Sequence, residues 1–484
     1  MRPPFLLISE PARLVRLRLS RLAAPAAYLS ALALIWLSFA SYTSQFSPVG
    51  RWAADANDPA DYRFIAEYFW GVPFHPNTYD SIWHGGWGDY LRLIPFRSIG
   101  LGSFYLLAGW LRLGHAPSTP DEVIAAGIAL AYAQKALLAI ALIVLFAVVR
   151  RRWNTALALF AVAATAFPPI YWRISDDFLT EPPQRIVFLF AFACAIAMSG
   201  PRSTDDDRRA APTFLLLALW LVATHLKVQW YLGALLLLPV LIFETSRRAL
   251  VSRRAVTLTA AALLVPASVM AVNWIGWRTT TLSPGFGLHA NLRYEGDVLR
   301  EYSAAMANAP DRPAFADPNR PQLRWWHIYV GPEVTRAQYE AFDRFGRTYL
   351  RQRPGSAMRN FGTGLQLAST VPAVQRVTQG RIRLEPLDPP WATLVRWLDI
   401  AIWILLGIGL AFAETRLPSA LALVLWIVPA IGNIVSPYEL RYHLPMSGIG
   451  AIAAACVVVT LRRPFDRLRA VPRTIEGRRL APER

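Results

Sequence analysis

The chain has 484 residues, of which 54% are hydrophobic and only 17% are charged. Soluble domains usually carry about 25% charged residues, whereas here the charges gather in short arginine-rich clusters between long apolar runs. The composition therefore excludes a string of soluble domains and predicts a polytopic membrane protein.

Ten segments are candidate membrane-spanning helices, because each is mostly apolar and a span needs about 20 such residues. The first follows a basic cluster, and its apolar stretch is longer than that of a signal peptide, so we interpret it as a retained helix. The ten candidates run approximately over 23–46, 123–149, 153–172, 183–199, 213–226, 229–244, 256–276, 395–413, 418–436 and 443–461.

Arginine clusters set the predicted orientation of these helices. The chain has 50 Lys and Arg against 32 Asp and Glu, a net charge of +18. If the N-terminus lies in the cytoplasm, every compact cluster falls on the cytoplasmic side, as the positive-inside rule requires. The clusters are Arg150–Arg152, Arg202 with Arg208 and Arg209, Arg247 with Arg248, Arg253 and Arg254, then Arg416 and the tail from Arg462. This topology explains the basic excess, and no basic face of a folded domain is visible, so we expect no nucleic-acid partner.

The predicted fold is an all-α membrane protein with about ten transmembrane helices and both termini in the cytoplasm. Only two basic residues are lysines, Lys135 and Lys227, which is typical of a GC-rich bacterial genome, so we expect the bacterial inner membrane. The expected parts are a transmembrane module over 1–276 that includes a first external loop over 47–120, a periplasmic segment over 277–394, three last transmembrane helices over 395–461 and a cytoplasmic tail over 462–484.

Two external stretches should form helices that do not span the membrane. Ser98–Leu113 is apolar but short, so it should lie at the interface or re-enter. Thr335–Leu350 has the periodicity of an amphipathic helix and should stop before Pro354. The two cysteines, Cys194 and Cys456, lie in apolar runs and suggest neither a disulfide framework nor a metal cluster.

Acidic residues are scarce, so the cluster of Asp55, Asp58 and Asp61 in the first external loop stands out. Asp58-Pro59 is a favourable helix start, with the Asp as N-cap and the Pro in the first turn. The helix that follows would place on one face Tyr62, Ile65, Ala66 and Phe69. One interpretation is capping of an interfacial helix, and the other is a general base or a metal ligand at the membrane surface.

A second acidic cluster, Asp176, Asp177 and Glu181, lies between the third and fourth helices on the same predicted side. Carboxylates against helix ends in a membrane are costly unless they are paired, hydrated or used. Acids in a first turn also complement the helix dipole. A structural and a functional role both remain open for this loop.

Three basic residues depart from the cytoplasmic pattern. Lys227 lies at the external turn between the fifth and sixth helices, and Arg441 lies just before the last helix. Lys135 lies inside the second helix, where a cation that snorkels to the interface is one interpretation. External cations beside external carboxylates would suit an anionic phosphate that is brought to a nucleophile.

Four motifs follow one another in the chain and share the external side of the predicted topology. They are the loop from Asp58 to Gly71, the segment Asp177–Pro182, the turn Thr224–Lys227 and the segment Glu439–Pro445. Together they resemble the GT-C superfamily of integral-membrane glycosyltransferases, which includes protein O-mannosyltransferases and aminoarabinose lipid A transferases. Pro59 stands where many members have a second acid, so Asp55 and Asp61 remain alternatives to Asp58.

The resemblance implies an enzyme that moves a sugar from a polyprenyl-phosphate donor to a hydroxyl of a glycan, lipid or protein acceptor on the external face. It implies that Asp58, or one of its alternatives, acts as the base or orients the acceptor. The cations Lys227 and Arg441, helped by Tyr442 and Lys135, would hold the donor phosphate. The chemistry fits, because an attacking hydroxyl needs a carboxylate and a departing phosphate needs cations.

The second acidic cluster has two expected roles under this resemblance. Asp176, Asp177 and Glu181 would support the acceptor. Alternatively, Asp58 and Asp177 would hold a divalent metal such as Mg²⁺ or Mn²⁺, because metal use varies among members of the superfamily.

Two other functions remain open. An O-antigen ligase or polymerase would use external arginines and a histidine, which the large external segment supplies as Arg293, Arg320, Arg324 and His327. A lipid flippase or transporter would place ionisable groups deep in the membrane, and Gln134 with Lys135 is the best support for it. Turnover distinguishes the two classes, because a transferase releases polyprenyl phosphate and a flippase leaves its lipid unchanged.

Overall fold

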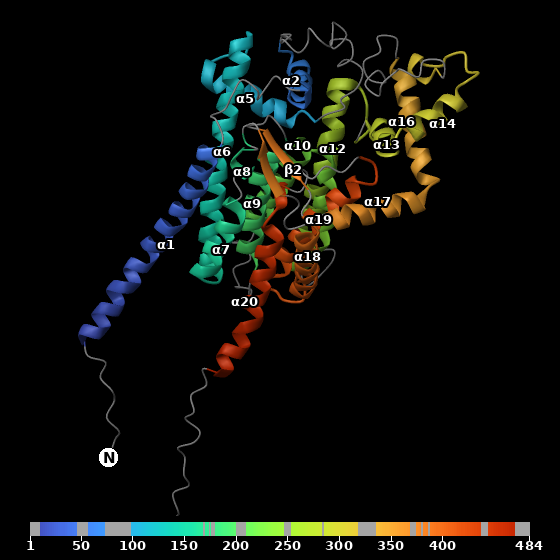
Figure 1. The fold of residues 1–484 in the computed structure, drawn as a ribbon. Helices are drawn as coiled ribbons and strands as arrows, with labels where there is room; N and C mark the ends of the chain where they lie inside the picture. Colours follow the sequence, from blue (N-terminus) through green and yellow to red (C-terminus); the bar gives the residue numbers. More distant parts are fainter. Residues whose placement is uncertain are drawn as a thin grey trace, which may run out of the picture.

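Apolar helices dominate the structure, a computed structural model (Figure 1). It describes residues 10–45, 57–72, 98–167, 170–173, 175, 180–199, 210–245, 253–282, 285–317, 335–367, 374–378, 381–385, 388–436 and 444–469. Within these residues, 6 helices are long and apolar enough to cross a membrane, and four shorter helices are also apolar. The protein is an all-α polytopic membrane protein, as predicted, and the count of ten spans stays a prediction.

The helices and strands follow the chain in this order. The long apolar helices are α1 (Glu10–Gln45), α6 (Pro120–Arg152), α9 (Glu181–Met198), α12 (Arg253–Trp277), α18 (Pro389–Gly409) and α20 (Ile449–Arg469). The shorter apolar helices are α7 (Thr155–Ala166), α10 (Ala210–Leu226), α11 (Tyr231–Thr245) and α19 (Arg416–Gly432). Between them lie α2 (Asn57–Trp70), α5 (Gly100–Leu113), α8 (Ile170–Arg173), η3 (Val228–Trp230), α13 (Phe286–Arg293), α14 (Asp297–Ala305), η4 (Ala314–Ala316), α16 (Arg336–Arg351) and α17 (Pro354–Leu367).

Arginine clusters meet at one end of the bundle, which we name the arginine end. Arg416 donates to Glu244 at 2.5 Å and so joins the first turn of α19 to the end of α11. Arg463 of α20 donates to Glu414 at 2.6 Å and to the last residue of α6 at 3.0 Å. Helix α1 begins and α20 ends on this side, and α2 lies at the opposite end, which we name the α2 end (Figure 1). These clusters therefore share one side, as predicted.

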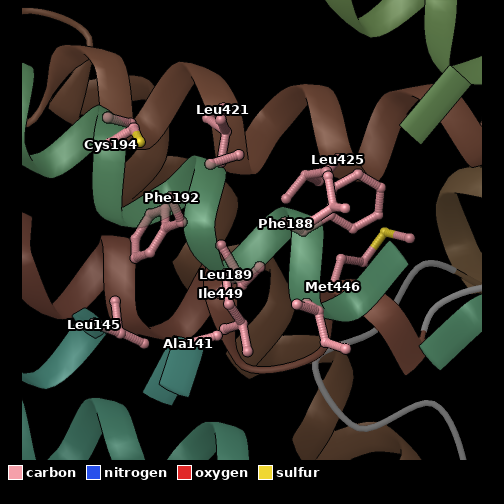
Figure 2. Packing of buried hydrophobic residues seen from close by; sticks show 14 of the residues in the cluster. Ala141, Leu145, Phe188, Leu189, Phe192, Cys194, Leu421, Leu425, Met446 and Ile449 are labelled. Carbon is pink, nitrogen blue, oxygen red and sulfur yellow. The ribbon is translucent and has the colours of Figure 1, made fainter. Parts of the chain in front are cut away.

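Helix α9 is the centre of the main hydrophobic core. Its Phe188 and Phe192 are buried between α6, α19 and the start of α20, beside Leu425 and Ile449 (Figure 2). In a bilayer, helices associate through close van der Waals packing, which small side chains at the contacts permit, and alanines recur along α9. Because neighbours surround α9, its first two turns are held firmly at the α2 end.

A second hydrophobic core lies at the α2 end, between α13, α14, η4, α16 and the last residue of α12. Aromatic rings from α14, η4 and α16 contact one another at centroid distances from 5.2 to 6.1 Å. Ile65 of α2 is fully buried in the same core. Thr335 caps α16 and α17 begins at Pro354, so the predicted amphipathic helix is confirmed.

The apolar stretch after residue 98 forms α5, which bridges α10 and α6. A Cβ on Gly100 would lie 2.4 Å from the backbone oxygen of His225, so only glycine permits this approach to the end of α10. A Cβ on Gly109 would lie 3.0 Å from Ala126, near the start of α6. Helix α5 has 14 residues and is short for a span. It contacts α10 and α6 where these two longer helices reach the α2 end of the bundle, as expected of an interfacial helix.

One hairpin is a local addition to the helical fold. The strands β1 (Val374–Thr378) and β2 (Arg381–Glu385) pair antiparallel, with Val374 opposite Glu385. β-branched residues among polar ones favour strands in both segments. The hairpin lies in the chain between α17 and α18.

Candidate active site at the α2 end

Helix α2 carries two of the three aspartates proposed as the base. It begins one residue before Asp58, so Asp58 and Asp61 lie in its first two turns, close to the predicted start. Their side chains, and all of Asp55, lie outside the described residues. Farther along the helix, Ile65 and Ala66 are fully buried, which confirms the predicted inward face at these two positions.

A buried ion pair on α2 was not found by sequence analysis. The side chains of Arg63 and Glu67 are 0% and 1% exposed, and Nε lies 3.6 Å from Oε1. Charges removed from water are costly unless they are paired, so this pair sets which face of α2 turns inward. The signal was present as opposite charges four residues apart, but such pairs more often stabilise an exposed helix face.

Helix α5 connects α2 to the turn that carries Lys227. On one side, Trp70 Nε1 at the end of α2 donates to Ser103 Oγ at 2.8 Å. On the other side, Ser98 Oγ donates to the backbone oxygen of Leu226 at 2.6 Å. Leu226 directly precedes Lys227. The first motif, which ends at Gly71, and the third motif, which ends at Lys227, therefore lie on two sides of α5.

The turn formed by Lys227 and η3, named the Lys227 turn, is fixed against α9. Trp230 Nε1 donates to Gln184 Oε1 at 3.1 Å. Gln184 lies one turn along α9 from Glu181, the first residue of that helix, whose side chain is buried. The second and third motifs are therefore neighbours, and they bring a carboxylate and a cation to the same end of the bundle.

Arg185, in the second turn of α9, holds the approach to the last helix. Its Nη1 donates to the backbone oxygens of Leu444 at 2.8 Å and Ser447 at 3.3 Å, and its Nη2 donates to the oxygen of Thr165 in α7. The guanidinium also lies 3.5 Å from the centroid of the Tyr171 ring in α8. The buried Arg185 side chain therefore joins Leu444, in the fourth motif, to helix α8, which precedes the second motif in the chain.

The last turn of α19, which leads into the fourth motif, is held by the second core and by the Lys227 turn. Arg293 Nε donates to the backbone oxygen of Asn433 at 3.0 Å, and its Nη2 donates to Asn360 Oδ1 at 2.7 Å. A Cβ on Gly432 would lie 2.8 Å from Gln229 Oε1 in η3. The described residues on the two sides of the fourth motif therefore contact η3, which follows the third motif, and Arg185, which follows the second motif.

Lys135 lies between α6 and α1, away from water. Its Nζ donates to Tyr42 Oη at 3.0 Å and lies 4.8 Å from the centroid of the same ring. At 7% exposure it does not snorkel to the interface, so that interpretation was wrong, and its role at a donor phosphate stays a prediction. Other predicted residues lie outside the described ones, namely Asp176, Asp177, Arg441, Tyr442, Arg320, Arg324 and His327.

A metal site cannot be assembled from the described residues, because nowhere among them do three or more His, Cys, Asp or Glu side chains gather. Asp58 and Asp177, the proposed ligands, have side chains outside that part of the chain. A divalent metal therefore stays a prediction, and the described groups around the site include cations, aromatic rings, backbone oxygens and the carboxylate of Glu181.

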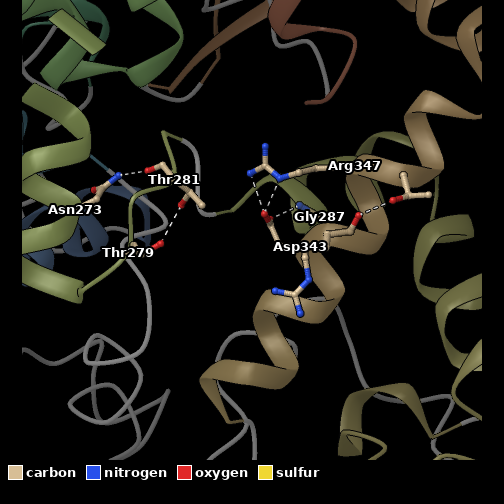
Figure 3. Close-up of polar contacts among 8 residues, drawn as sticks. Asn273, Thr279, Thr281, Gly287, Asp343 and Arg347 are labelled. Carbon is tan, nitrogen blue, oxygen red and sulfur yellow. Dashed lines mark hydrogen bonds and ion pairs between the residues drawn. The ribbon is translucent and has the colours of Figure 1, made fainter. Parts of the chain in front are cut away.

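Arg347 of α16 brings another cation to this end of the molecule (Figure 3). Its Nε and Nη2 donate to Asp343 Oδ2 at 3.0 and 2.9 Å, while Asp343 Oδ1 accepts from the Gly287 backbone at 2.7 Å. Burial raises the pKa of Asp343 above its ordinary value, and the Gly287 N–H and the Arg347 charge offset part of that rise. The Arg347 charge also interacts with the phenol of Tyr231, so it lies near the Lys227 turn.

An apolar groove of about 600 Å³ lies between α5, α6, α9 and α10. Its walls are mostly aliphatic, and exposed residues such as Leu111 leave it open to the outside of the bundle. Val222, just before the Lys227 turn, and Pro183, just after Glu181, place one part of the wall beside the motifs. Gln134 also lines the groove, and its buried Oε1 accepts no hydrogen bond from the described residues.

Comparisons with known proteins find distant similarities. No family model and no curated protein matches the chain. The archaeal oligosaccharyltransferase AglB from Archaeoglobus fulgidus, solved with an inhibitory peptide and a dolichol-phosphate, is 12% identical, with a TM-score of 0.44 over 93% of this chain and 52% of that one. ArnT from Cupriavidus metallidurans bound to undecaprenyl phosphate is 14% identical, with a TM-score of 0.35 over 95% of this chain and 81% of that one.

The chain spans about half the length of the archaeal oligosaccharyltransferase. At these identities and TM-scores, the donor, the acceptor and the catalytic residues have to be argued from the chain's own residues.

Proposed function

We propose that the protein is a GT-C type glycosyltransferase, which moves a sugar from a polyprenyl-phosphate donor to a hydroxyl acceptor at the α2 end. The observation that carries this proposal is the contact between four motif-bearing segments that lie far apart in the sequence. Hydrogen bonds through Trp70, Ser98, Trp230 and Arg185 join them in one continuous set. Acidic and basic segments brought together in this way suit a reaction between an anionic lipid donor and a neutral hydroxyl.

In the proposed reaction, Asp58 accepts the proton of the acceptor hydroxyl as that oxygen attacks the anomeric carbon of the donor sugar. The bond from the anomeric carbon to the donor phosphate oxygen breaks, and polyprenyl phosphate leaves with its electron pair. Lys227 and Arg441 stabilise the charge on the departing phosphate. Asp55 and Asp61 remain alternatives for the base, and a general base contributes about 10²–10⁴ to the rate.

The apolar groove supports the assignment of a lipid donor. A polyprenyl chain is as apolar as the membrane interior, so it needs an aliphatic channel that opens sideways from the bundle rather than a polar pocket. The groove between α5, α6, α9 and α10 has this character and reaches the residues beside Lys227 and Glu181. A donor could therefore keep its chain among the helices while its phosphate meets the cations of the site.

The acceptor side is supported by the second acidic cluster. Glu181 is buried at the start of α9, next to the segment that contains Asp176 and Asp177. A carboxylate in this position can accept a hydrogen bond from an acceptor hydroxyl and orient it toward the anomeric carbon. The sugar and the acceptor class are left to the assay that follows.

The test mixes the purified full-length protein, in lipid vesicles, with a panel of polyprenyl-phosphate sugars and a crude cell-envelope acceptor fraction. The readout is free polyprenyl phosphate. We expect release from at least one donor, a loss of about 10²–10⁴-fold in Asp58→Asn, and an unchanged melting temperature. The matched control is Asp311→Asn, an exposed aspartate between α14 and η4, which should leave the rate unchanged.

The outcomes separate the alternatives. Near-wild-type turnover in Asp58→Asn would refute Asp58 as the base, and the same assay on Asp55→Asn and Asp61→Asn would then choose between the other two aspartates. No release from any donor, with intact lipid crossing the bilayer, would refute the transferase and favour a flippase.

A further inference from the structure

A cavity lies between α1 and α6 at the arginine end, opposite the candidate active site. Its volume is about 540 Å³, and it is lined by Tyr28, Ala147, Val148, Arg150 and Arg151. Its wall therefore changes from small apolar side chains to two adjacent arginines over one turn of α6. Such a change of polarity is expected where the hydrocarbon interior of a bilayer meets its headgroups.

Aromatic rings hold one of these arginines in place. The Arg150 guanidinium lies 5.3 Å from the centroid of the Tyr28 ring, and this ring meets Phe146 edge-on at 5.1 Å. A ring attracts a cation through its electron-rich face but does not neutralise it. Arg150 is therefore oriented at the cavity and keeps its charge.

The three arginines that end α6 differ in their partners. Arg152 lies 3.9 Å from Glu414 and belongs to the ion-pair network that joins α6 to α20. Across the described part of the chain, no carboxylate lies within ion-pair distance of Arg150 or Arg151. The positive-inside rule explains why arginines lie at this end, but it does not explain why two of them line a cavity.

We propose that this cavity binds the headgroup of an anionic phospholipid from the leaflet at the arginine end. Phosphate oxygens accept charge-assisted hydrogen bonds from guanidinium groups, often in pairs. The acyl chains would continue along the apolar side of α6 at Ala147 and Val148. A zwitterionic lipid fits less well, because its own cation competes with the two arginines. The proposal does not depend on the transferase activity.

Native mass spectrometry of the purified full-length protein in detergent tests this site, with phosphatidylglycerol and phosphatidylcholine as probes. A cation beside an anionic lipid contributes about fivefold to binding, so R150Q/R151Q should raise the Kd for phosphatidylglycerol about 25-fold. Binding of phosphatidylcholine should not change. R150K/R151K keeps the charge and should retain most of the affinity.

The matched control is R344Q/R359Q, which removes the same charge from exposed arginines of α16 and α17 and should change the Kd by less than about twofold. An equal loss in this control would show that binding follows net charge, and it would overturn the site. Inorganic phosphate that binds through Arg150 and Arg151 as tightly as the lipid does would also overturn it, in favour of a free-anion site.

A second variant keeps the proposal testable if R150Q/R151Q does not fold, which circular dichroism would report. Tyr28→Leu removes the ring that orients Arg150 and should raise the Kd for phosphatidylglycerol about two- to fivefold. An unchanged Kd in Tyr28→Leu, with the protein folded, would refute the role of the ring and the geometry on which the site rests.

Discussion

Arg416 and Arg463 at the arginine end are held differently from Arg185 at the α2 end. At the arginine end, Arg416 and Arg463 donate to the carboxylates of Glu244 and Glu414, and these pairs join helices that are distant in the sequence. At the α2 end, Arg185 instead donates to backbone oxygens and stacks on an aromatic ring. Both arrangements fasten helices together, but only the first neutralises the cation.

This difference indicates what each end can do. A carboxylate partner cancels the charge of an arginine, so the arginine end is suited to fixing topology. Carbonyl oxygens and rings orient a cation and leave its positive potential in place, where a low dielectric strengthens it. Arg185 thus leaves a positive potential at the α2 end that suits an anionic group such as a donor phosphate. By contrast, Arg63 and Arg347 at the same end pair with Glu67 and Asp343. Arg150, stacked on Tyr28, is the described case at the arginine end that follows the second pattern.

The largest effect should come from Arg185. Arg185→Leu leaves three backbone oxygens without their donor, and hydrogen bonds to charged groups contribute about 1.5–3 kcal/mol each. We expect the free energy of unfolding to fall by about 4–9 kcal/mol, and the melting temperature in detergent should fall with it. Arg185→Lys should fold but lose activity, because an ammonium cannot reach both Leu444 and Thr165 as a planar fork does. A wild-type melting temperature in Arg185→Leu would contradict the proposal that Arg185 stabilises the fold by holding these three backbone oxygens together.

A smaller effect should come from Lys227, whose proposed role is electrostatic rather than structural. Removing a charged hydrogen bond to the donor phosphate costs about 1.5–3 kcal/mol, so Lys227→Ala should raise the KM for the donor about 10- to 150-fold. The KM for the acceptor and the melting temperature should not change, and Arg344→Ala serves as the control at an exposed position. If the acceptor KM changes and the donor KM does not, the phosphate role is wrong.

Sequence reasoning was strong where side-chain type carries the signal. Apolar length predicted the helices, and arginine position predicted that Arg152, Arg416 and Arg463 share a side. Helical spacing predicted that Ile65 and Ala66 share a face of α2. The amphipathic pattern after Thr335 predicted α16 in the same way. Each of these features follows from the hydropathy or charge of consecutive residues.

The contacts that assemble the candidate site are not visible in the hydropathy or charge of consecutive residues. Arg185 binds the backbone oxygens of Leu444 and Ser447. Every residue type has a backbone oxygen, so no pattern in the sequence predicts which residues Arg185 binds. Lys135 meets Tyr42 on a helix 93 positions away, and only the packing of α1 against α6 brings them together. The sequence therefore predicted which residues matter at the α2 end more readily than how they are held.

A modest effect should come from the arginine end, where the ion pairs serve the fold alone. Arg416→Gln loses the pair with Glu244 and should lower the free energy of unfolding by about 1–2 kcal/mol without changing the rate of transfer by the folded protein. A double-mutant cycle with Glu244→Gln isolates the pair from other contacts of Arg416. If fully folded Arg416→Gln transfers sugar more slowly than wild type, the ion pairs at the arginine end do not serve the fold alone.

The smallest effect should appear in the second core, through the carboxyl of Asp343. Burial raises its pKa above the value of about 3.9 for an unfolded aspartate, so the folded core binds this proton more tightly than the unfolded chain does. The resulting stability is fully present below about pH 3.9 and is lost as the pH rises through the higher pKa of the folded state. Asp343→Asn removes this dependence.

Hydrogen exchange of peptides from α13 and α16 between pH 4 and 7, corrected for the intrinsic rate, measures the effect of Asp343 directly. Wild type should lose protection as the pH rises, Asp343→Asn should lose less, and Asp311→Asn should follow wild type. Protection that instead grows with pH in wild type would mean that the Arg347 charge outweighs burial. The Arg347–Asp343 pair, which already joins the two side chains through two hydrogen bonds, would then contribute its stability at neutral rather than at low pH.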